Sequence, residues 1–186
     1  MNNKLTGSDY LLLLLYLNNQ KPIYGAVKLE KMMFIFDKEI KKIISSKGFK
    51  IDKMPEFIAY HFGPFSKDVY VQIELFKNIK FVDVIDKKTK EDMDEVDDVL
   101  ILDDSISYNE LTNDGKLTVY TIANKGIAYV EEKIVPLLSG EIINLLENFK
   151  SKIVSLPSRS LLKYVYSKYP EYTVNSIIKE EVLNDY

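Results

Sequence analysis

The segment that most constrains the fold is residues 25–46, GAVKLEKMMFIFDKEIKKIISS, because its apolar residues recur at intervals of three and four. This spacing places them on one side of an α-helix; they are Leu29, Met32, Met33, Phe36, Ile40, Ile43 and Ile44. The lysines fall mostly off this stripe and predict a basic outer side; they are Lys28, Lys31, Lys38, Lys41 and Lys42. We therefore expect an amphipathic helix that Gly48 ends, with the paired methionines in the core.

The leucine run LLLLLYL, residues 11–17, is too short for a membrane span, which needs about 20 apolar residues. It is closed by Asn18, Asn19, Gln20 and Lys21, with no cleavage site after it, so it does not read as an export signal. We expect a buried helix that begins at Ser8, a suitable N-cap. The expected location is the cytoplasm, and the absence of cysteine gives mild support for a reducing compartment.

The stretch FIAYHFGPFSKDVY, residues 57–70, predicts the entry to another helix. Residues 56–62 alternate and are rich in aromatics, which favours a short strand or extended segment that contains His61. Gly63 and Pro64 break this strand, and Ser66 is placed to cap a helix that runs to about Lys80. Phe65 and Tyr70 have the spacing of a hydrophobic staple across the start of that helix.

Two further strands are predicted at residues 81–85 and 117–122, and together they form a β-hairpin wing. Residues 81–115 carry 12 acidic residues against 3 lysines, whereas residues 1–80 carry 13 lysines against 8 acidic residues. We therefore expect an acidic insertion at residues 86–116, with one short strand at 99–102. This asymmetry suggests a charged partner or a solvated loop.

The remaining chain predicts helices only. Asn124 is placed to cap a helix that ends near Pro136, and three more are expected at residues 139–154, 158–169 and 176–183. The predicted fold class is α+β, mainly helical. Residues 1–136 form a winged helix-turn-helix-like domain with its β-hairpin wing, and residues 137–186 form a helical extension packed on it.

The residues required for common catalytic and metal sites are missing. One histidine, His61, excludes two-histidine metal sites, and the chain has neither a phosphate loop nor a dinucleotide fingerprint. A Ser-His-Asp triad on His61 stays open because triads assemble in space, but a packed histidine beside a turn is favoured. An E-x-K pair at Glu39 and Lys41 lies on a helix, where nuclease carboxylates are not expected. We predict no enzyme activity, no cofactor and no metal.

A tyrosine-rich stretch, KYVYSKYPEY, follows at residues 163–172. Its rings alternate with lysines, as in platforms that stack single-stranded bases. At helical spacing, however, Tyr164 and Tyr166 point to either side of Tyr169. Packing or a protein interface is the favoured interpretation.

Three segments resemble a known family: KLEKMMFIF at residues 28–36, HFGPFSKDVY at 61–70 and YTIANKG at 120–126. They resemble the phage-associated YwgA-like proteins and the related SocA-like, or Panacea, antitoxin domain. Ala123 departs from the family pattern, which usually has threonine there. The resemblance covers roughly residues 8–136, and YSKYPEYTVNSI near the end is also similar. It implies a protein from mobile elements or toxin–antitoxin loci that binds a partner protein and has no transferable catalytic motif.

Two functions follow as hypotheses. The first is a non-enzymatic, antitoxin-like interaction protein whose partner is a protein such as a toxin. Its expected partner-binding residues are Lys28, Lys31, His61, Gly63, Pro64, Phe65, Ser66, Lys67, Tyr70 and Lys77. The second is a winged-helix DNA-binding regulator, in which Lys67, Gln72, Lys77 and Asn78 face the groove, supported by Lys28 and Lys31. The acidic block disfavours the second, because it would repel phosphates.

Overall fold

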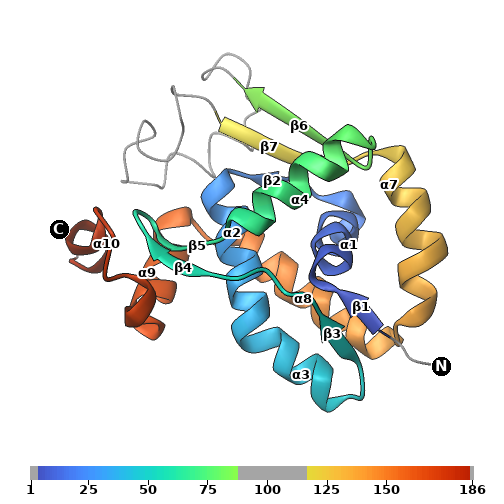
Figure 1. Ribbon diagram of the computed structural model, residues 1–186, viewed down its shortest axis with the longest axis horizontal. Coiled ribbons are helices and arrows are strands. Elements are labelled where there is room, and N and C mark those ends of the chain that lie inside the picture. The colour runs from blue at the N-terminus through green and yellow to red at the C-terminus, as the bar shows by residue number, and fades with distance from the viewer. Residues whose placement is uncertain (1–3, 88–116, 185–186) are drawn as a thin grey trace.

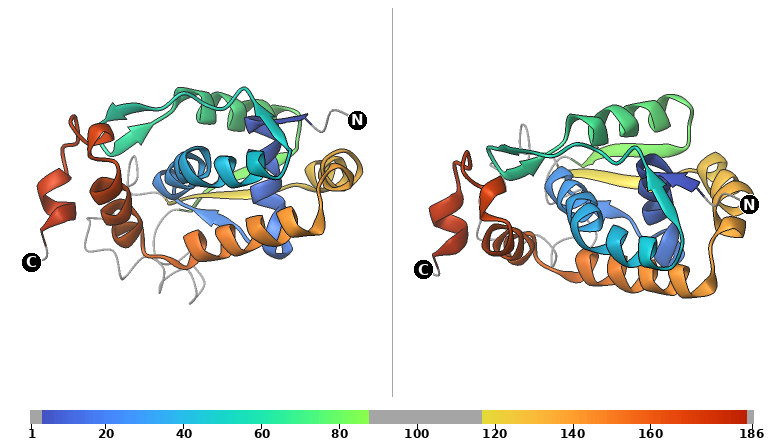
Figure 2. Two further views of the ribbon diagram at one scale, coloured as in Figure 1. Left: turned by 90° about the horizontal axis from the view of Figure 1, so that it is seen from below. Right: turned by 60° about the horizontal axis from the view of Figure 1, so that its bottom comes forward.

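The computed structural model describes residues 4–87 and 117–184, and these form a mainly helical α+β fold (Figure 1). The predicted coarse class is confirmed. Figure 2 shows α2 (Ala26–Ile35) and α3 (Lys41–Ser46) in a middle layer, between α4 (Lys67–Asn78) on one side and α8 (Gly140–Ser155) on the other. Among the described residues, no helix is long and apolar enough to cross a membrane.

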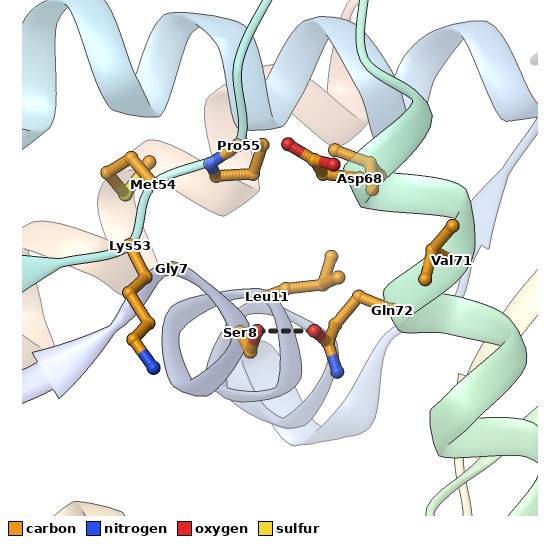
Figure 3. Close-up of a pocket in the computed structure, with 10 residues that line it drawn as sticks. Gly7, Ser8, Leu11, Lys53, Met54, Pro55, Asp68, Val71 and Gln72 are labelled. Carbon is orange, nitrogen blue, oxygen red and sulfur yellow. Dashed lines mark hydrogen bonds between the residues drawn. The ribbon is translucent and has the colours of Figure 1, made fainter.

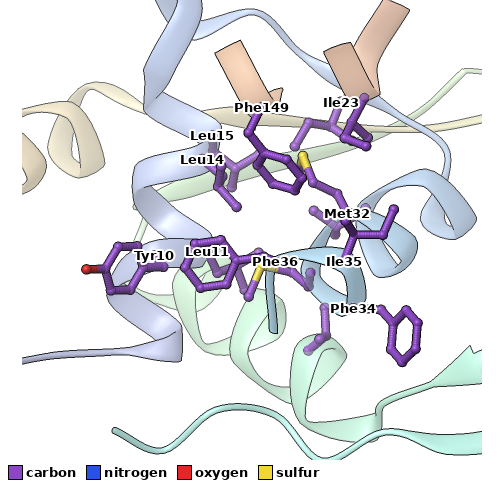
Figure 4. Packing of buried hydrophobic residues seen from close by; sticks show 14 of the residues in the cluster. Tyr10, Leu11, Leu14, Leu15, Ile23, Met32, Phe34, Ile35, Phe36 and Phe149 are labelled. Atoms are coloured by element: carbon purple, nitrogen blue, oxygen red, sulfur yellow. The ribbon is translucent and has the colours of Figure 1, made fainter. Parts of the chain in front are cut away.

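The leucine run lies on α1 (Gly7–Gln20), at the centre of the core. Figure 4 shows Leu11, Leu14 and Leu15 packed toward α2 and toward Phe149 of α8. The predicted cap at Ser8 is wrong. Thr6 is the N-cap, since its hydroxyl accepts from Asp9 N while the Asp9 carboxylate accepts from Thr6 N, as in a capping box. The preceding strand, β1 (Lys4–Thr6), pairs in parallel with β3 (Lys50–Asp52).

The last residues of α1 adopt a left-handed backbone conformation. Asn18, Asn19 and Gln20 have φ values of 55°, 53° and 60°, in the left-handed region that asparagine adopts more readily than other non-glycine residues. Buried Lys150 of α8 contacts this end, where its Nζ donates to the carbonyl oxygens of Leu15 (3.2 Å) and Leu17 (2.7 Å). These bonds satisfy carbonyls that the helix leaves without partners.

The amphipathic helix predicted for residues 25–46 is present, but it contains a wider turn. It consists of α2, the π-helical turn η1 (Phe36–Ile40) and α3. Gly48 follows α3 with φ 86°, as expected of a C-terminal glycine. Most of the predicted stripe is buried, but Ile43 is 42% exposed because the π turn changes the helical phase after residue 36.

The predicted basic outer side is wrong for two lysines. Lys28 and Lys31 are 2% and 0% exposed, so both lie in the interior. The helix that carries them is surrounded by α8, α9 (Ser158–Lys168) and β5 (Gly63–Phe65), and it buries every residue from Lys28 to Ile35. Periodicity could not show this, because it assumes one solvent-facing side.

The predicted hairpin is confirmed: β6 (Val82–Lys87) pairs antiparallel with β7 (Leu117–Ile122). A third strand that the sequence did not predict, β2 (Ile23–Tyr24), pairs with the other edge of β7. The acidic insertion lies almost wholly outside the described residues, as does the predicted strand at 99–102.

The aromatic stretch forms a second hairpin, which joins β4 (Ile58–Tyr60) to β5. The predicted strand was therefore too long, and His61 lies in the turn with Phe62 instead of in a strand. Gly63 and Pro64 do not end the extended structure, because they belong to β5. Ser66 is the N-cap of α4, and the Phe65 and Tyr70 rings stack at 5.6 Å, which confirms the predicted staple.

The C-terminal helices largely follow the prediction. Ala123, not Asn124, is the N-cap of α7 (Asn124–Tyr129), which continues through η4 (Val130–Ile134) and η5 (Val135–Leu137). Helix α8 matches the helix expected at residues 139–154, and Ser139 is its N-cap. After α9 come η6 (Pro170–Tyr172) and α10 (Lys179–Leu183), the latter shorter than predicted. The expected domain boundary at residue 136 stays a prediction; apolar residues of α8 and α9 belong to the same core cluster as those of α1 and α2.

Candidate functional site

Two of the sequence segments that carry the family resemblance meet inside the protein. Lys31 Nζ donates to the Pro64 carbonyl oxygen at 2.7 Å and lies 3.1 Å from Glu30 Oε2. The other carboxylate oxygen of Glu30 accepts from Ser66 N at 3.1 Å. We use the name buried junction for Glu30, Lys31, Pro64, Ser66 and Tyr70.

Burial determines the electrostatics of the buried junction. Loss of hydration raises the pKa of Glu30, although Lys31 and the Ser66 N–H favour the carboxylate. The same loss lowers the pKa of Lys31, against the attraction of Glu30. The pKa of Tyr70 is raised by burial and by the nearby Glu30 carboxylate. Because each charged group faces a partner, the pair is tolerated where a lone charge would not be.

The buried junction fixes the start of α4. It ties the backbone of β5 and of the N-cap residue Ser66 to α2. Ser66 Oγ is buried and has no hydrogen-bond partner among the described residues, so the hydroxyl does not cap the helix in the way the sequence suggested. Sequence reasoning missed Glu30; the signal was an acid–base pair between apolar Leu29 and Met32.

Gly63 is required at its position for two reasons. Its φ is 82°, and a Cβ there would lie 2.7 Å from Cε1 of Tyr166 in α9. The β4–β5 hairpin is therefore packed directly against the C-terminal part of the chain. Its turn is also held there, since Ile177 N donates to the His61 carbonyl oxygen at 3.0 Å.

His61 is part of a row of aromatic rings on the protein surface. Its ring stacks on Tyr60 at 4.2 Å, Tyr60 lies 5.0 Å from Phe65, and Phe65 stacks on Tyr70. Within the described residues the imidazole has no hydrogen-bond partner, so the structure assembles no triad around it there. The imidazole is exposed and stacks on Tyr60 beside the β4–β5 turn, and the role of His61 stays a prediction.

The outer face of α4 carries balanced charge and two exposed apolar side chains. Lys67 and Lys77 are offset by Asp68 and Glu74, while Val71 and Leu75 are 57% and 49% exposed. Gln72, predicted to face a groove in DNA, instead accepts a 2.7 Å hydrogen bond from Ser8 through its Oε1. Of the predicted partner-binding residues, His61, Lys67 and Lys77 are exposed, and Phe65 and Tyr70 are half-buried. The other five lie in the interior: Lys28, Lys31, Gly63, Pro64 and Ser66.

A pocket with a volume of about 290 Å³ opens beside this face (Figure 3). Its apolar lining includes Leu11 of α1, Met54 and Pro55 of the segment after β3, and Val71 of α4. Lys53 and Asp68 are the charged residues of its lining. No sequence signal identified this pocket, because its walls come from three separate parts of the chain.

The tyrosine-rich stretch is used for packing, as the sequence favoured. Tyr169 and Tyr172 lie edge-on to Phe34, at 5.0 and 4.8 Å, and Tyr166 is buried. Glu39 of the π turn accepts hydrogen bonds from Tyr164 (2.7 Å) and Tyr169 (2.8 Å), and it pairs with Lys168 (3.1 Å). Burial alone would raise the pKa of Glu39, but these three donors lower it. The carboxylate therefore fastens α9 to the helix formed by α2 and η1.

Within residues 4–87 and 117–184, no three histidine or acidic side chains are grouped closely enough to share a metal ion. Comparison with known proteins gave no match to a family model, a curated protein or a solved structure. The family resemblance of the sequence therefore stays a prediction.

Proposed function

We propose that this chain is a non-catalytic, antitoxin-like module that binds a partner protein through the outer face of α4 and the adjoining β4–β5 hairpin. The observation that carries the proposal is the composition of the α4 face. Exposed Val71 and Leu75 lie among charges that cancel, which suits a protein surface. A surface for nucleic acid is normally dominated by basic residues, because affinity comes largely from phosphate contacts.

The positions of the lysines support the same proposal. Lys28 and Lys31, which the DNA-binding hypothesis needs at the surface, are buried. Lys31 is committed to Glu30 and Pro64, so it contributes to the shape of the hairpin and of α4 instead of meeting a phosphate.

Co-expression with the product of the neighbouring gene tests this function. We expect the two proteins to copurify, and growth inhibition by the neighbour, where it is toxic, to be relieved. Leu75→Glu is expected to abolish both effects, whereas Lys42→Glu, an exposed change on α3, leaves them intact. If the Leu75→Glu variant still copurifies with the neighbour and still relieves growth inhibition, the α4 face is not the binding surface.

A winged-helix DNA-binding protein is the second candidate, favoured by the order of elements. Helix α4 is followed directly by the β6–β7 hairpin, and β2 adds a third strand to that sheet. A DNA band shift at low salt that disappears in the Lys67→Ala, Lys77→Ala double variant would support this candidate and contradict the first.

A further inference from the structure

The pocket and the outer face of α4 form one continuous surface. Val71 belongs to both, since its side chain lines the pocket and is also exposed to solvent (Figure 3). Leu75 lies one helical turn further along α4, so the two side chains form an apolar ridge that leads into the pocket.

The lining of the pocket specifies what can enter it. The lining is mixed: Leu11, Met54, Pro55 and Val71 form its apolar part, and its polar part includes Ser8 and Gln72, which are joined by a hydrogen bond. A volume of about 290 Å³ lies at the lower limit of about 300–1,000 Å³ for small-ligand pockets. The pocket is thus large enough for one large apolar side chain that has polar groups beside it.

The charges of the lining are opposite in sign and come from different walls. Lys53 belongs to the segment between β3 and β4, and Asp68 to the first turn of α4. The Asp68 carboxylate is held in place because it accepts from Glu56 N at 3.1 Å. An occupant of complementary charge has an acidic residue on the Lys53 side and a basic residue on the Asp68 side.

We propose that the pocket and the Val71–Leu75 ridge receive an amphipathic helix of the partner protein, with one large apolar side chain in the pocket flanked by an acidic and a basic residue. The ridge has the spacing of one helical turn, which matches the i, i+4 apolar residues of a second helix. This inference rests on the proposed protein-binding function and names the element that the partner contributes.

A displayed library of helical peptides, selected on the full-length protein, tests the proposal without knowledge of the partner. We expect selected peptides to share apolar residues at i, i+3 or i+4 and i+7, with an acidic and a basic residue beside the first. Val71→Glu is expected to weaken binding of a selected peptide by about tenfold or more, measured by fluorescence polarisation. Val174→Glu is the matched control, since Val174 is 68% exposed and lies outside the pocket lining.

A charge exchange tests whether Lys53 of the pocket pairs with the acidic residue of the bound peptide. Lys53→Glu is expected to weaken a selected peptide, and reversing the acidic residue of that peptide to lysine is expected to restore binding. Lys53 is exposed, so circular dichroism should show an unchanged fold in the Lys53→Glu variant.

Several results would overturn the proposal. They are selection of extended or proline-rich peptides, selection of no binder at all, and binding that Val71→Glu leaves intact. If the neighbouring gene product copurifies while Val71→Glu has no effect on it, the pocket proposal fails and the protein-binding function stands. If neither the neighbour nor any peptide binds, both fail.

Discussion

The ammonium group of Lys31 donates a 2.7 Å hydrogen bond to the carbonyl oxygen of Pro64 in the interior of the protein. This one contact joins α2 to the β4–β5 hairpin, 33 residues later in the chain. The sequence predicted that Lys31 faces solvent. In the structure it holds the β4–β5 hairpin against α2 instead.

Replacing Lys31 with methionine is expected to destabilise the protein strongly. The substitution leaves Glu30 buried without its cation, and breaking a buried pair in this way costs about 3–5 kcal/mol. Urea unfolding measures the change, with exposed Lys42→Met as the control for loss of a lysine. The Glu30→Met, Lys31→Met double variant should lose less than the sum of the two single variants, and strict additivity would contradict the coupling.

Gly63→Ala is expected to destabilise the protein more than Gly48→Ala does. Both glycines have positive φ, 82° and 86°, so both substitutions carry a similar backbone strain of about 1 kcal/mol. Only at Gly63 does the new methyl group meet another atom, Cε1 of Tyr166 at 2.7 Å, whereas nothing lies within 4 Å at Gly48. Thermal unfolding of the two variants isolates the steric part, and equal losses would mean that Tyr166 moves aside freely.

Lys150 is expected to make the stability rise with pH above neutrality. Burial lowers its pKa to about 7, and the positive charge of Lys21 adds to this effect. In the unfolded chain the pKa is about 10.4. The folded state therefore binds fewer protons between these values, so the free energy of unfolding increases with pH by up to about 1.4 kcal/mol per unit.

Lys150→Met should flatten that dependence. The measurement is urea unfolding from pH 6 to pH 9.5 on both proteins, with the exposed Lys152→Met as the control. An unchanged slope in Lys150→Met would show that the amine is hydrated or that other groups dominate in this range.

Tyr164→Phe is expected to move the pKa of Glu39 back toward its ordinary value. The wild-type pKa is lowered because the hydrogen bonds from Tyr164, Tyr169 and Lys168 outweigh the effect of burial. The carboxylate therefore contributes stability above its unfolded pKa of about 4.3 and loses it as the pH falls through the lowered value. Carbon-detected NMR titration of the Glu39 carboxyl reports the change, and Tyr60→Phe should leave it unaltered.

The sequence predicted those parts of the fold that depend on local spacing. The Met32–Phe36–Ile40 stripe, the start of α4 at Ser66 and the Phe65–Tyr70 staple all follow from neighbours within one or two helical turns. The parts it missed depend on distant partners. Two residues of β2 gain their strand only by pairing with β7, and the burial of Lys31 is satisfied by Pro64.

The candidate binding surface was also predicted only in part from the sequence. Lys67 and Lys77 were placed on the outer side of α4 by periodicity, and the structure exposes both. The pocket could not be predicted, since Leu11, Met54 and Val71 meet only after three segments have folded together. The role of Gln72 also depended on Ser8, 64 residues earlier.

The π turn η1 has a consequence for comparing this chain with others. A π turn accommodates one more residue per turn than an α-helix does, so it acts as a single-residue insertion hidden within a continuous helix. A relative that lacks the turn would align with this chain only if a gap were opened between residues 36 and 40, where alignment methods penalise gaps most heavily. Deleting one residue there should convert the turn to regular α-helix and leave the phase of α3 unchanged, so that Ile44 stays buried and Ile43 exposed, at the expense of the position of Glu39.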